Sequence, residues 1–181
     1  DFYSNFDFYP ERNVDIEFSH LSSQGGIDNV VLDDDFSNTS VGLNLTSKDR
    51  GFEWNSGIDL NHREVSYYGL SDEFISSLSQ DELNSIDSKQ IYTRLSAYGG
   101  IDFYDLYLKT VEVKLQNFSD DYSNSEQLIK IEPLVEIPLR NQNLTIEGDF
   151  SYLNGGFETV TFMPFEIDYQ QLQAGVNPFV N

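Results

Sequence analysis

Cysteine is absent from this chain, so neither disulfide bonds nor thiolate metal sites stabilise the fold. The sequence also lacks any run of about 18 consecutive apolar residues, which excludes a membrane-spanning helix. Basic residues are scarce: 10 lysines and arginines stand against 31 acidic residues, and the formal net charge is -21. Nucleic acid and anionic membrane surfaces are therefore disfavoured as partners, because this charge repels both.

The two chain ends carry no recognisable targeting segment. The sequence starts without methionine or a signal peptide, and its last residues, 176–181, have the composition of a strand. We therefore expect a processed or truncated piece of a longer chain. No domain boundary, low-complexity segment or longer-period repeat divides the sequence, so residues 1–181 are interpreted as a single β-barrel region.

Apolar and polar residues alternate along nine segments, which is the period of a half-buried β-strand. In residues 13–22, for example, Val14 and Ile16 alternate with Asp15 and Glu17. The nine segments are 1–9, 13–22, 40–46, 52–61, 91–103, 107–118, 128–139, 144–153 and 165–180. This pattern predicts an all-β, antiparallel up-and-down meander.

The connections between these segments differ in length in a regular way. Tight turns are expected at residues 9–12, 47–51, 104–106 and 140–143, and longer links at 23–39, 69–89 and 154–164. Short turns at one end and long loops at the other are typical of outer-membrane β-barrels. Aromatic residues near strand ends also favour a membrane, namely Tyr9, Trp54, Tyr67, Tyr68, Tyr104, Tyr107 and Tyr122. We expect an outer-membrane β-barrel or a fragment of one, with a soluble β-sandwich as the alternative.

Three local features depart from regular strands. In the link 69–89, Ser71 or Asp72 is the expected N-cap of a short helix, broken near Ser79. Pro133 removes a ladder hydrogen bond inside a predicted strand, so an edge or a bulge is expected there. The Gly99-Gly100 pair marks a possible bend or bulge.

The polar face of the predicted meander is the candidate functional surface. If the apolar residues face lipid, the charged residues on the other face line or plug the lumen of the barrel. These candidates are Asp15, Glu17, Glu53, Asp59, Arg94, Glu112, Lys114, Glu147 and Asp149. Their excess of carboxylates favours cations over anions, and solute passage or uptake across the outer membrane is the expected function. The alternatives are a non-transporting surface anchor, whose loops 23–39 and 70–88 bind a partner or a glycan, and a soluble β-sandwich binding module.

Four stretches resemble a known group of proteins. They are residues 18–27 (FSHLSSQGGI), 33–39 (DDDFSNT), 67–70 (YYGL) and 117–123 (NFSDDYS). Together they resemble outer-membrane β-barrel proteins of Bacteroidetes of the TonB-dependent receptor-like kind. The resemblance implies that the chain is a central or C-terminal piece of a larger barrel. A bacterial outer-membrane location and contact with outer-membrane lipid are expected, and a surface lipoprotein or another barrel subunit is the further partner considered. No plug domain or TonB-box-like segment is identified, so energised uptake is not supported.

Few residues are candidates for catalysis or metal binding. His20 and His62 both fall near the long-loop ends of their strands, but no nucleophile motif accompanies them. Catalysis needs a positioned nucleophile, base and orienting group, so no catalytic residue is assigned and no enzyme is expected. Asp33, Asp34 and Asp35 supply oxygen ligands of the kind that Ca²⁺ takes, although their spacing is not that of an EF-hand. Calcium is the only cofactor considered, and solvated loop acids are the alternative interpretation.

Overall fold

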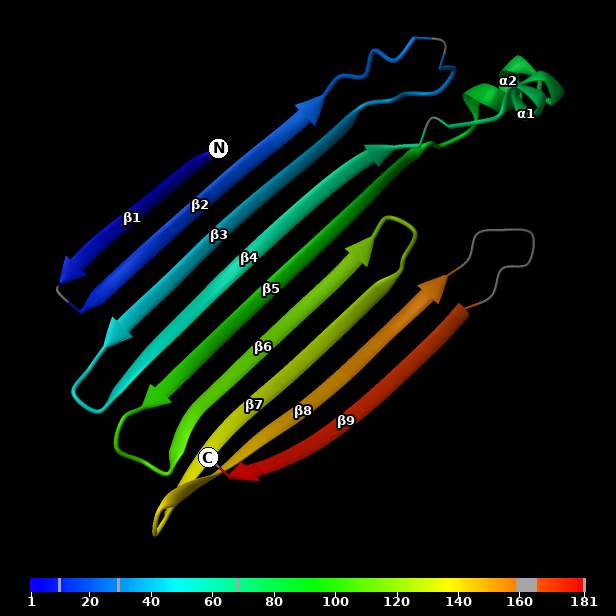
Figure 1. Cartoon of the computed structure of the whole chain (residues 1–181). Helices are drawn as coiled ribbons and strands as arrows, with labels where there is room; N and C mark the ends of the chain where they lie inside the picture. The colour runs from blue at the N-terminus through cyan, green and yellow to red at the C-terminus, as the bar shows by residue number, and fades with distance from the viewer. Residues whose placement is uncertain (10, 29, 68, 159–165, 181) are drawn as a thin grey trace.

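The protein is described by a computed structural model that covers residues 1–9, 11–28, 30–67, 69–158 and 166–180. Nine strands form one sheet in which every neighbouring pair is antiparallel, and strand order in the sheet follows order in the chain (Figure 1). The strands are β1 (Phe2–Tyr9), β2 (Arg12–Ser23), β3 (Phe36–Lys48), β4 (Phe52–Ser66), β5 (Lys89–Phe103), β6 (Leu108–Asp120), β7 (Ser125–Leu139), β8 (Gln142–Glu158) and β9 (Glu166–Val180). The predicted all-β up-and-down meander is confirmed.

Two short helices lie in the connection between β4 and β5, as the sequence predicts. Helix α1 (Asp72–Ser77) begins at Ser71, whose side chain accepts the N–H of Phe74. Helix α2 (Gln80–Asn84) begins at Ser79, which forms a capping box with Glu82. Among the described residues, no helix has the length and apolar character needed to cross a membrane.

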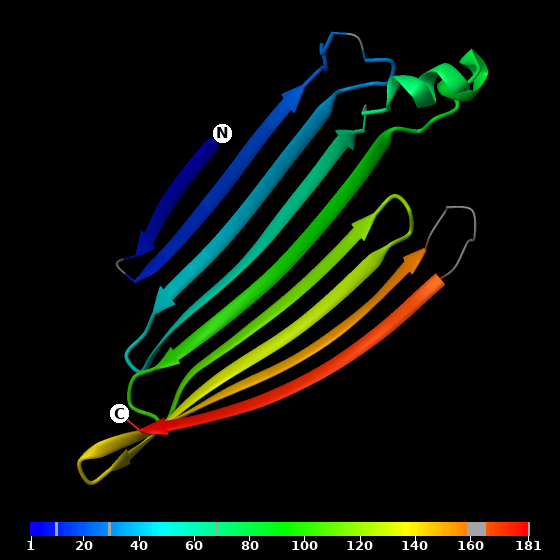
Figure 2. The same ribbon diagram turned by 45° about the vertical axis from the view of Figure 1, so that its right-hand side comes forward.

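The sheet is open and curved. β1 and β9 form its two edges, and each strand pairs only with its neighbours in the chain. Figure 2 shows the sheet bending into a trough, with the helical loop at one end of the strands. Curvature of this kind follows from the right-handed twist between neighbouring strands.

The strand register divides the side chains between two faces. Residues directly opposite one another on neighbouring strands point to the same side of a sheet. One row of such partners runs through Ile16, Leu43, Ile58, Ala97, Leu115, Ile129, Tyr152 and Leu172. The next row runs through Asp15, Asn44, Gly57, Tyr98, Lys114, Lys130, Ser151 and Gln173. We call the side of the first row the apolar face and the side of the second row the polar face.

The apolar face is not covered by another layer of the described residues. Leu83, in the helical loop, is the one apolar side chain that is buried in the described part of the chain. Side chains of the apolar face are exposed both on the inner strand β4, where Ile58 is 45% exposed, and on the edge strand β9, where Leu172 is 81% exposed. The described residues form a single sheet without a hydrophobic core of its own.

Several strands are longer than the alternation predicts. β3 begins at Phe36, so the first long link shortens to residues 24–35. β4 runs to Ser66, which is five residues beyond its predicted end at 61. Only residues 121–124 separate β6 from β7, so one connection at the long-loop end is a tight turn. The added residues are largely Ser, Asn, Thr and charged types, which pair through the backbone without showing apolar alternation. The centre of the third predicted link, residues 159–165, lies outside the described residues.

The two expected irregularities have different outcomes. β7 is continuous through Pro133. Residues 132 and 133 have no paired residue on β8, however, and the register between β6 and β7 shifts between Leu108 and Thr110. The Gly99-Gly100 pair lies in unbroken register with both neighbours, so a bulge there is wrong. A Cβ on Gly100 would lie only 3.2 Å from Oδ1 of Asn55, which shows that this glycine leaves room for a neighbouring side chain.

Candidate functional site

All the residues predicted to line a lumen lie on the polar face. Their register positions place Asp15 and Glu17 on β2, Glu53 and Asp59 on β4, Arg94 on β5, Glu112 and Lys114 on β6, and Glu147 and Asp149 on β8, all on this one side. The period of two in the sequence therefore places all of these side chains on one face of the sheet, as the register does. That this face borders a lumen stays a prediction.

Two hollows lie on the polar face side by side. The first has a volume of about 620 Å³, and its lining includes Asp59, Tyr98 and Lys114. The second has a volume of about 660 Å³, and its lining includes Glu147 and Asp149 but no lysine or arginine. Glu112 and Glu132 line both hollows. The hollowed side of the sheet is thus the acidic side.

Asp15 is held by a hydrogen-bond network near the β1 edge. Its carboxylate accepts hydrogen bonds from the Tyr3 hydroxyl at 3.0 Å, from Nδ2 of Asn5 at 2.6 Å and from Nδ2 of Asn44 at 3.3 Å. Three donors from two strands, β1 and β3, hold this carboxylate without any cation. Asp15 therefore serves as a structural group of the polar face.

The negative charges of the carboxylates on β6, β7 and β8 are only partly balanced by neighbouring lysines. Nζ of Lys130 lies 2.7 Å from Oε1 of Glu132 and 3.1 Å from Oδ2 of Asp149. Glu112 lies directly opposite Glu132 and has no hydrogen-bond or ion-pair partner among the described residues. Like charges placed opposite each other repel, so this part of the polar face keeps an excess of negative potential.

Three residues outside the set of predicted lumen-facing candidates also shape this surface. Lys130 and Glu132 belong to an alternating strand, but only the register places them between Glu112 and Asp149. Tyr98 is also outside that set, and its ring fills the space beside Gly57, where a Cβ would collide with it. The signal for Tyr98 was the glycine itself, because a glycine inside a strand often marks close approach of a neighbouring group.

Polar residues form the boundary of the apolar face at the long-loop end. The row formed by His20, Thr39, His62 and Thr93 lies just beyond the row formed by Phe18, Val41, Leu60 and Leu95. On β4 the apolar face extends from Phe52 to Leu60 before His62 is reached. This length matches the roughly 9–11 residues with which a tilted strand crosses a bilayer.

The apolar region runs obliquely to the rows of paired residues. The row that holds apolar Phe18 and Leu60 on β2 and β4 continues as Asn117 on β6 and Asn154 on β8. At the short-turn end the order is reversed, because the polar residues of a row lie on β2 and β3 and its apolar residues on β4, β5 and β6. One such row contains Arg12 and Ser47 and then Trp54, Ile101 and Val111. The strands of a membrane barrel tilt by about 35–45° from the barrel axis. An apolar band that is parallel to the membrane plane therefore crosses neighbouring strands at different rows, as it does here.

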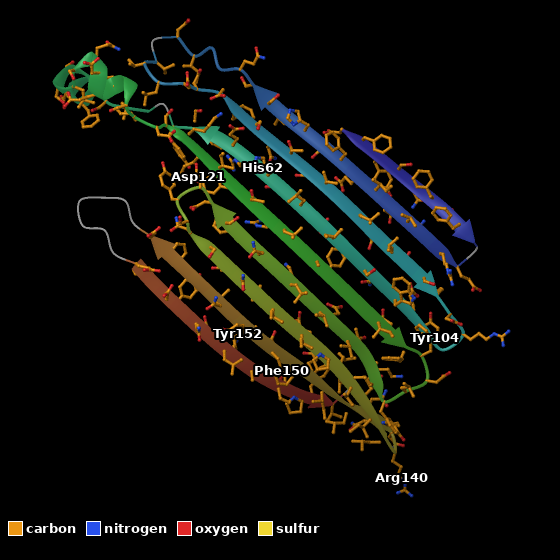
Figure 3. The ribbon with its side chains drawn as sticks, turned by 180° about the vertical axis from the view of Figure 1, so that it is seen from behind. His62, Tyr104, Asp121, Arg140, Phe150 and Tyr152 are labelled. Atoms are coloured by element: carbon orange, nitrogen blue, oxygen red, sulfur yellow. The ribbon has the colours of Figure 1, made fainter. Side chains whose placement is uncertain are left out.

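The two histidines lie on the apolar side, at its long-loop boundary. Nδ1 of His20 lies 2.9 Å from Oγ1 of Thr39, and Nδ1 of His62 lies 3.0 Å from Oγ1 of Thr93. Thr39 stands between the two imidazoles in the register, so they do not contact each other (Figure 3 shows His62 near this end). Neither histidine has a carboxylate partner among the described residues. The prediction that the chain is not an enzyme stays a prediction.

The loop acids near β3 have separate contacts. The carboxylate of Asp34 accepts the backbone N–H groups of Gly26 and Ile27, and its pKa is held below the ordinary value chiefly by the Ile27 N–H. Asp35 accepts a hydrogen bond from the Ser66 hydroxyl. No three metal-ligating side chains gather into a possible ion site in the described part of the chain. The calcium site at Asp33, Asp34 and Asp35 stays a prediction.

No protein-family model, curated protein sequence or solved structure matches this chain. The sheet itself is therefore the only basis for a proposed function.

Proposed function

We propose that this chain forms part of the wall of an outer-membrane β-barrel and that its polar face borders a passage for solutes. The observation that carries the proposal is the division of a single sheet, with exposed apolar side chains on one face and acidic hollows on the other. A barrel wall has this division, since lipid contacts its outer face and water its inner face. A soluble β-sandwich would instead cover the apolar face with a second sheet.

The direction of the edge strands supports a barrel of more than nine strands. β1 and β9 run the same way, so pairing them with each other would be parallel. A wholly antiparallel barrel that contains this meander needs an odd number of further strands. Bacterial barrels have even strand numbers, and the resemblance to Bacteroidetes barrel proteins points to the same larger assembly.

The charges of the polar face indicate which solutes would pass. Glu112, Glu132, Glu147 and Asp149 surround one hollow, and Lys130 from the neighbouring row offsets only part of their charge. Carboxylate-lined pores favour cations over anions. We therefore propose that the passage is cation-preferring and that Glu112 and Glu132, which border both hollows, contribute most to this preference.

The orientation of the sheet is tested with nitroxide labels on the full chain in lipid vesicles. Labels at Ile16, Leu43 and Val113, on the apolar face, should be reached by oxygen but not by a water-soluble nickel chelate. A label at Ser96, on the polar face, is the control and should be reached by the chelate. Chelate access to all three apolar positions would contradict a lipid-facing surface.

The passage is tested by potassium and chloride flux through the reconstituted full-length protein, in which the further strands close the barrel. Wild type should pass potassium in preference to chloride, and Glu112→Gln/Glu132→Gln should reduce that preference by several-fold without abolishing flux. Asp81→Asn, in the helical loop, is a charge-matched control for a single carboxylate. Absence of any flux would favour the surface anchor, whose capped helical loop binds a lipoprotein or another subunit.

A further inference from the structure

The polar face carries a group of apolar side chains near the long-loop end of β6 to β9. Leu128 lies directly opposite Leu153, and Phe157 lies directly opposite Ile167. We call the following six residues the apolar patch: Phe118, Leu128, Leu153, Phe157, Ile167 and Tyr169. The patch differs in composition from the two acidic hollows nearer the middle of the sheet.

Contact with lipid does not account for the apolar patch. The patch lies on the side opposite the apolar face, and at the same level the apolar face already carries Asn117, Gln127 and Asn154. In the proposed barrel the patch therefore faces water at the mouth of the passage, beyond the band that a bilayer covers. Phe157 is 41% exposed there. Apolar patches that face water often mark ligand-binding surfaces.

A carboxylate lies inside the apolar patch between two aromatic residues. Glu126 on β7 lies opposite Phe118 on β6 and opposite Gly155 on β8. The ring of Tyr169 lies over Gly155, where an added Cβ would be 2.6 Å from its Cζ, and the Tyr169 hydroxyl donates to Oε2 of Glu126 at 2.6 Å. Oε1 of Glu126 has no hydrogen-bond partner among the described residues. One oxygen of this carboxylate is therefore available to a ligand.

The aromatic rings beside Glu126 form two nearly parallel pairs. The ring centroids of Phe157 and Tyr169 are 5.6 Å apart with an interplanar angle of 14°, and those of Tyr92 and Phe118 are 6.2 Å apart with an angle of 24°. A cation within about 6 Å of a ring centroid, over its face, is attracted by the ring. The two leucines of the patch offer contact to an apolar group. Together these features fit an organic cation with an apolar body.

The surrounding charges favour a cationic ligand over an anionic one. The loops 24–35, 67–88 and 121–124 contain ten acidic residues and no lysine or arginine. The strand ends at and beyond the row of Glu126 hold three basic residues, of which Lys89 is paired with Glu64. The basic residues are Arg63, Lys89 and Arg94, and the acidic ones are Glu64, Asp120, Glu126, Glu158, Glu166 and Asp168. Acidic residues are thus in excess in the loops and in the strand ends.

Arg94 is the basic residue closest to Glu126 in the register. The two residues share a row, with Phe118 between them, so their backbones are two strand spacings or roughly 9–10 Å apart. No ion pair joins them in the described part of the chain, and the Debye length is only about 8 Å at physiological ionic strength. Arg94 therefore leaves Glu126 uncompensated, and it favours a cation on the Tyr169 side of the carboxylate.

We propose that the apolar patch and Glu126 bind organic ammonium cations that have an apolar body. The ammonium group lies beside the Glu126 carboxylate and the Tyr169 ring, and the apolar body covers Leu128 and Leu153. This inference rests on the proposed cation-preferring passage and names a class of solute for it. Binding at the mouth raises the local concentration of such cations next to the acidic hollows.

The test compares three probes that share a phenyl ring and differ in charge. Phenethylammonium is the cation, 2-phenylethanol is the neutral probe and 3-phenylpropanoate is the anion. Isothermal titration calorimetry measures the binding of each probe to the full-length protein in phosphatidylcholine nanodiscs, with empty nanodiscs as the blank. Phenethylammonium should bind roughly five- to thirty-fold more tightly than 2-phenylethanol, and 3-phenylpropanoate should bind most weakly.

A matched pair of substitutions locates the site. Glu126→Gln removes the charge and keeps an acceptor for the Tyr169 hydroxyl, so it should lower the preference for phenethylammonium to about twofold or less and leave 2-phenylethanol binding unchanged. Glu73→Gln, in α1 at the same end, removes the same charge away from the patch and should leave the preference unchanged. Tyr169→Leu should weaken phenethylammonium binding more than 2-phenylethanol binding, with strand content checked by circular dichroism.

The site and the passage can fail separately in these measurements. Equal binding of the three probes, tighter binding of the neutral or anionic probe, or an unchanged preference in Glu126→Gln would overturn the site. Selective potassium flux would then still support the passage. Selective phenethylammonium binding without any potassium flux would contradict the passage and leave the site as a surface receptor for organic cations.

Discussion

The ring of Tyr98 on β5 occupies the space beside Gly57 on β4, directly across the strand pair. Any side chain at position 57 would collide with that ring, so the two residues form a single packing unit on the polar face. A similar relation joins Tyr169 and Gly155 on β9 and β8, where the tyrosine hydroxyl also donates to Glu126 at 2.6 Å. Both pairs stiffen a sheet that has little other packing on this side.

Gly57→Ala should therefore lower the free energy of unfolding by about 0.5–1.5 kcal/mol, because the added methyl pushes the far end of the Tyr98 ring away from its preferred rotamer. Urea unfolding of the reconstituted chain measures this change. Gly51→Ala, where the added carbon meets open space, should change stability by less than about 0.5 kcal/mol. The double variant Gly57→Ala/Tyr98→Ala should show a coupling energy, and strict additivity would contradict the packing unit.

Lysine at Ile58 and lysine at Asp59 should behave differently, although the positions are adjacent. Ile58 lies in the middle of the apolar face and Asp59 on the polar face. In a bilayer, Ile58→Lys should cost about 2–4 kcal/mol, and Phe18→Lys, near the polar boundary, about 0–1 kcal/mol. Asp59→Lys should be tolerated. Unfolding from lipid vesicles provides the measurement, and an equal cost at all three positions would contradict the lipid-facing assignment.

Asp34 should make the first long loop sensitive to acid. The Ile27 N–H, with a smaller contribution from Gly26, keeps the pKa of Asp34 below its ordinary value. Because the pKa of Asp34 is lower in the folded loop than in the unfolded chain, its ionised carboxylate stabilises the loop at pH values above the unfolded pKa of about 3.9. This contribution is lost as the pH falls through the folded pKa. The amide NMR shifts of Gly26 and Ile27 should titrate with a midpoint below that value.

Asp34→Asn should remove this titration and accelerate amide exchange at Gly26 and Ile27 near neutral pH. Asp33→Asn is the matched control, because the Asp33 carboxylate has no hydrogen bond in the described part of the chain. An identical effect of both substitutions would show that the loop responds to its net charge and not to the Asp34 contacts.

Leu83→Ala should loosen the helical loop without affecting the sheet. Leu83 is 8% exposed, whereas Phe74 in the same loop is 49% exposed. Removing a buried leucine side chain costs about 2–5 kcal/mol in a well-packed core, and here the loss is confined to the loop between β4 and β5. Proteolytic cleavage between residues 69 and 88 should become faster, while the unfolding midpoint of the sheet stays constant. Phe74→Ala is the control and should change neither.

Much of this fold could be predicted from local pattern alone. The period of two separates Ile16 from Asp15 and Ile58 from Asp59, because successive residues of a strand point to opposite sides. The helix near Ser71 and its break at Ser79 could also be predicted, since capping involves residues within a few positions of each other. The strand ends at Phe36 and Ser66 could not be predicted, because polar residues extend a ladder through backbone hydrogen bonds that leave no apolar pattern.

The sequence by itself determined which side chains share a face and how many strands form, since both follow from contacts between near neighbours in the chain. Only the tertiary structure decided the register, which places Glu112 beside Glu132, Lys130 between two carboxylates, and Arg12 in line with Trp54. It also decided that the apolar region runs obliquely across the rows. The physical reason is that register depends on hydrogen bonds between segments far apart in sequence, and alternation within one segment carries no information about its partner.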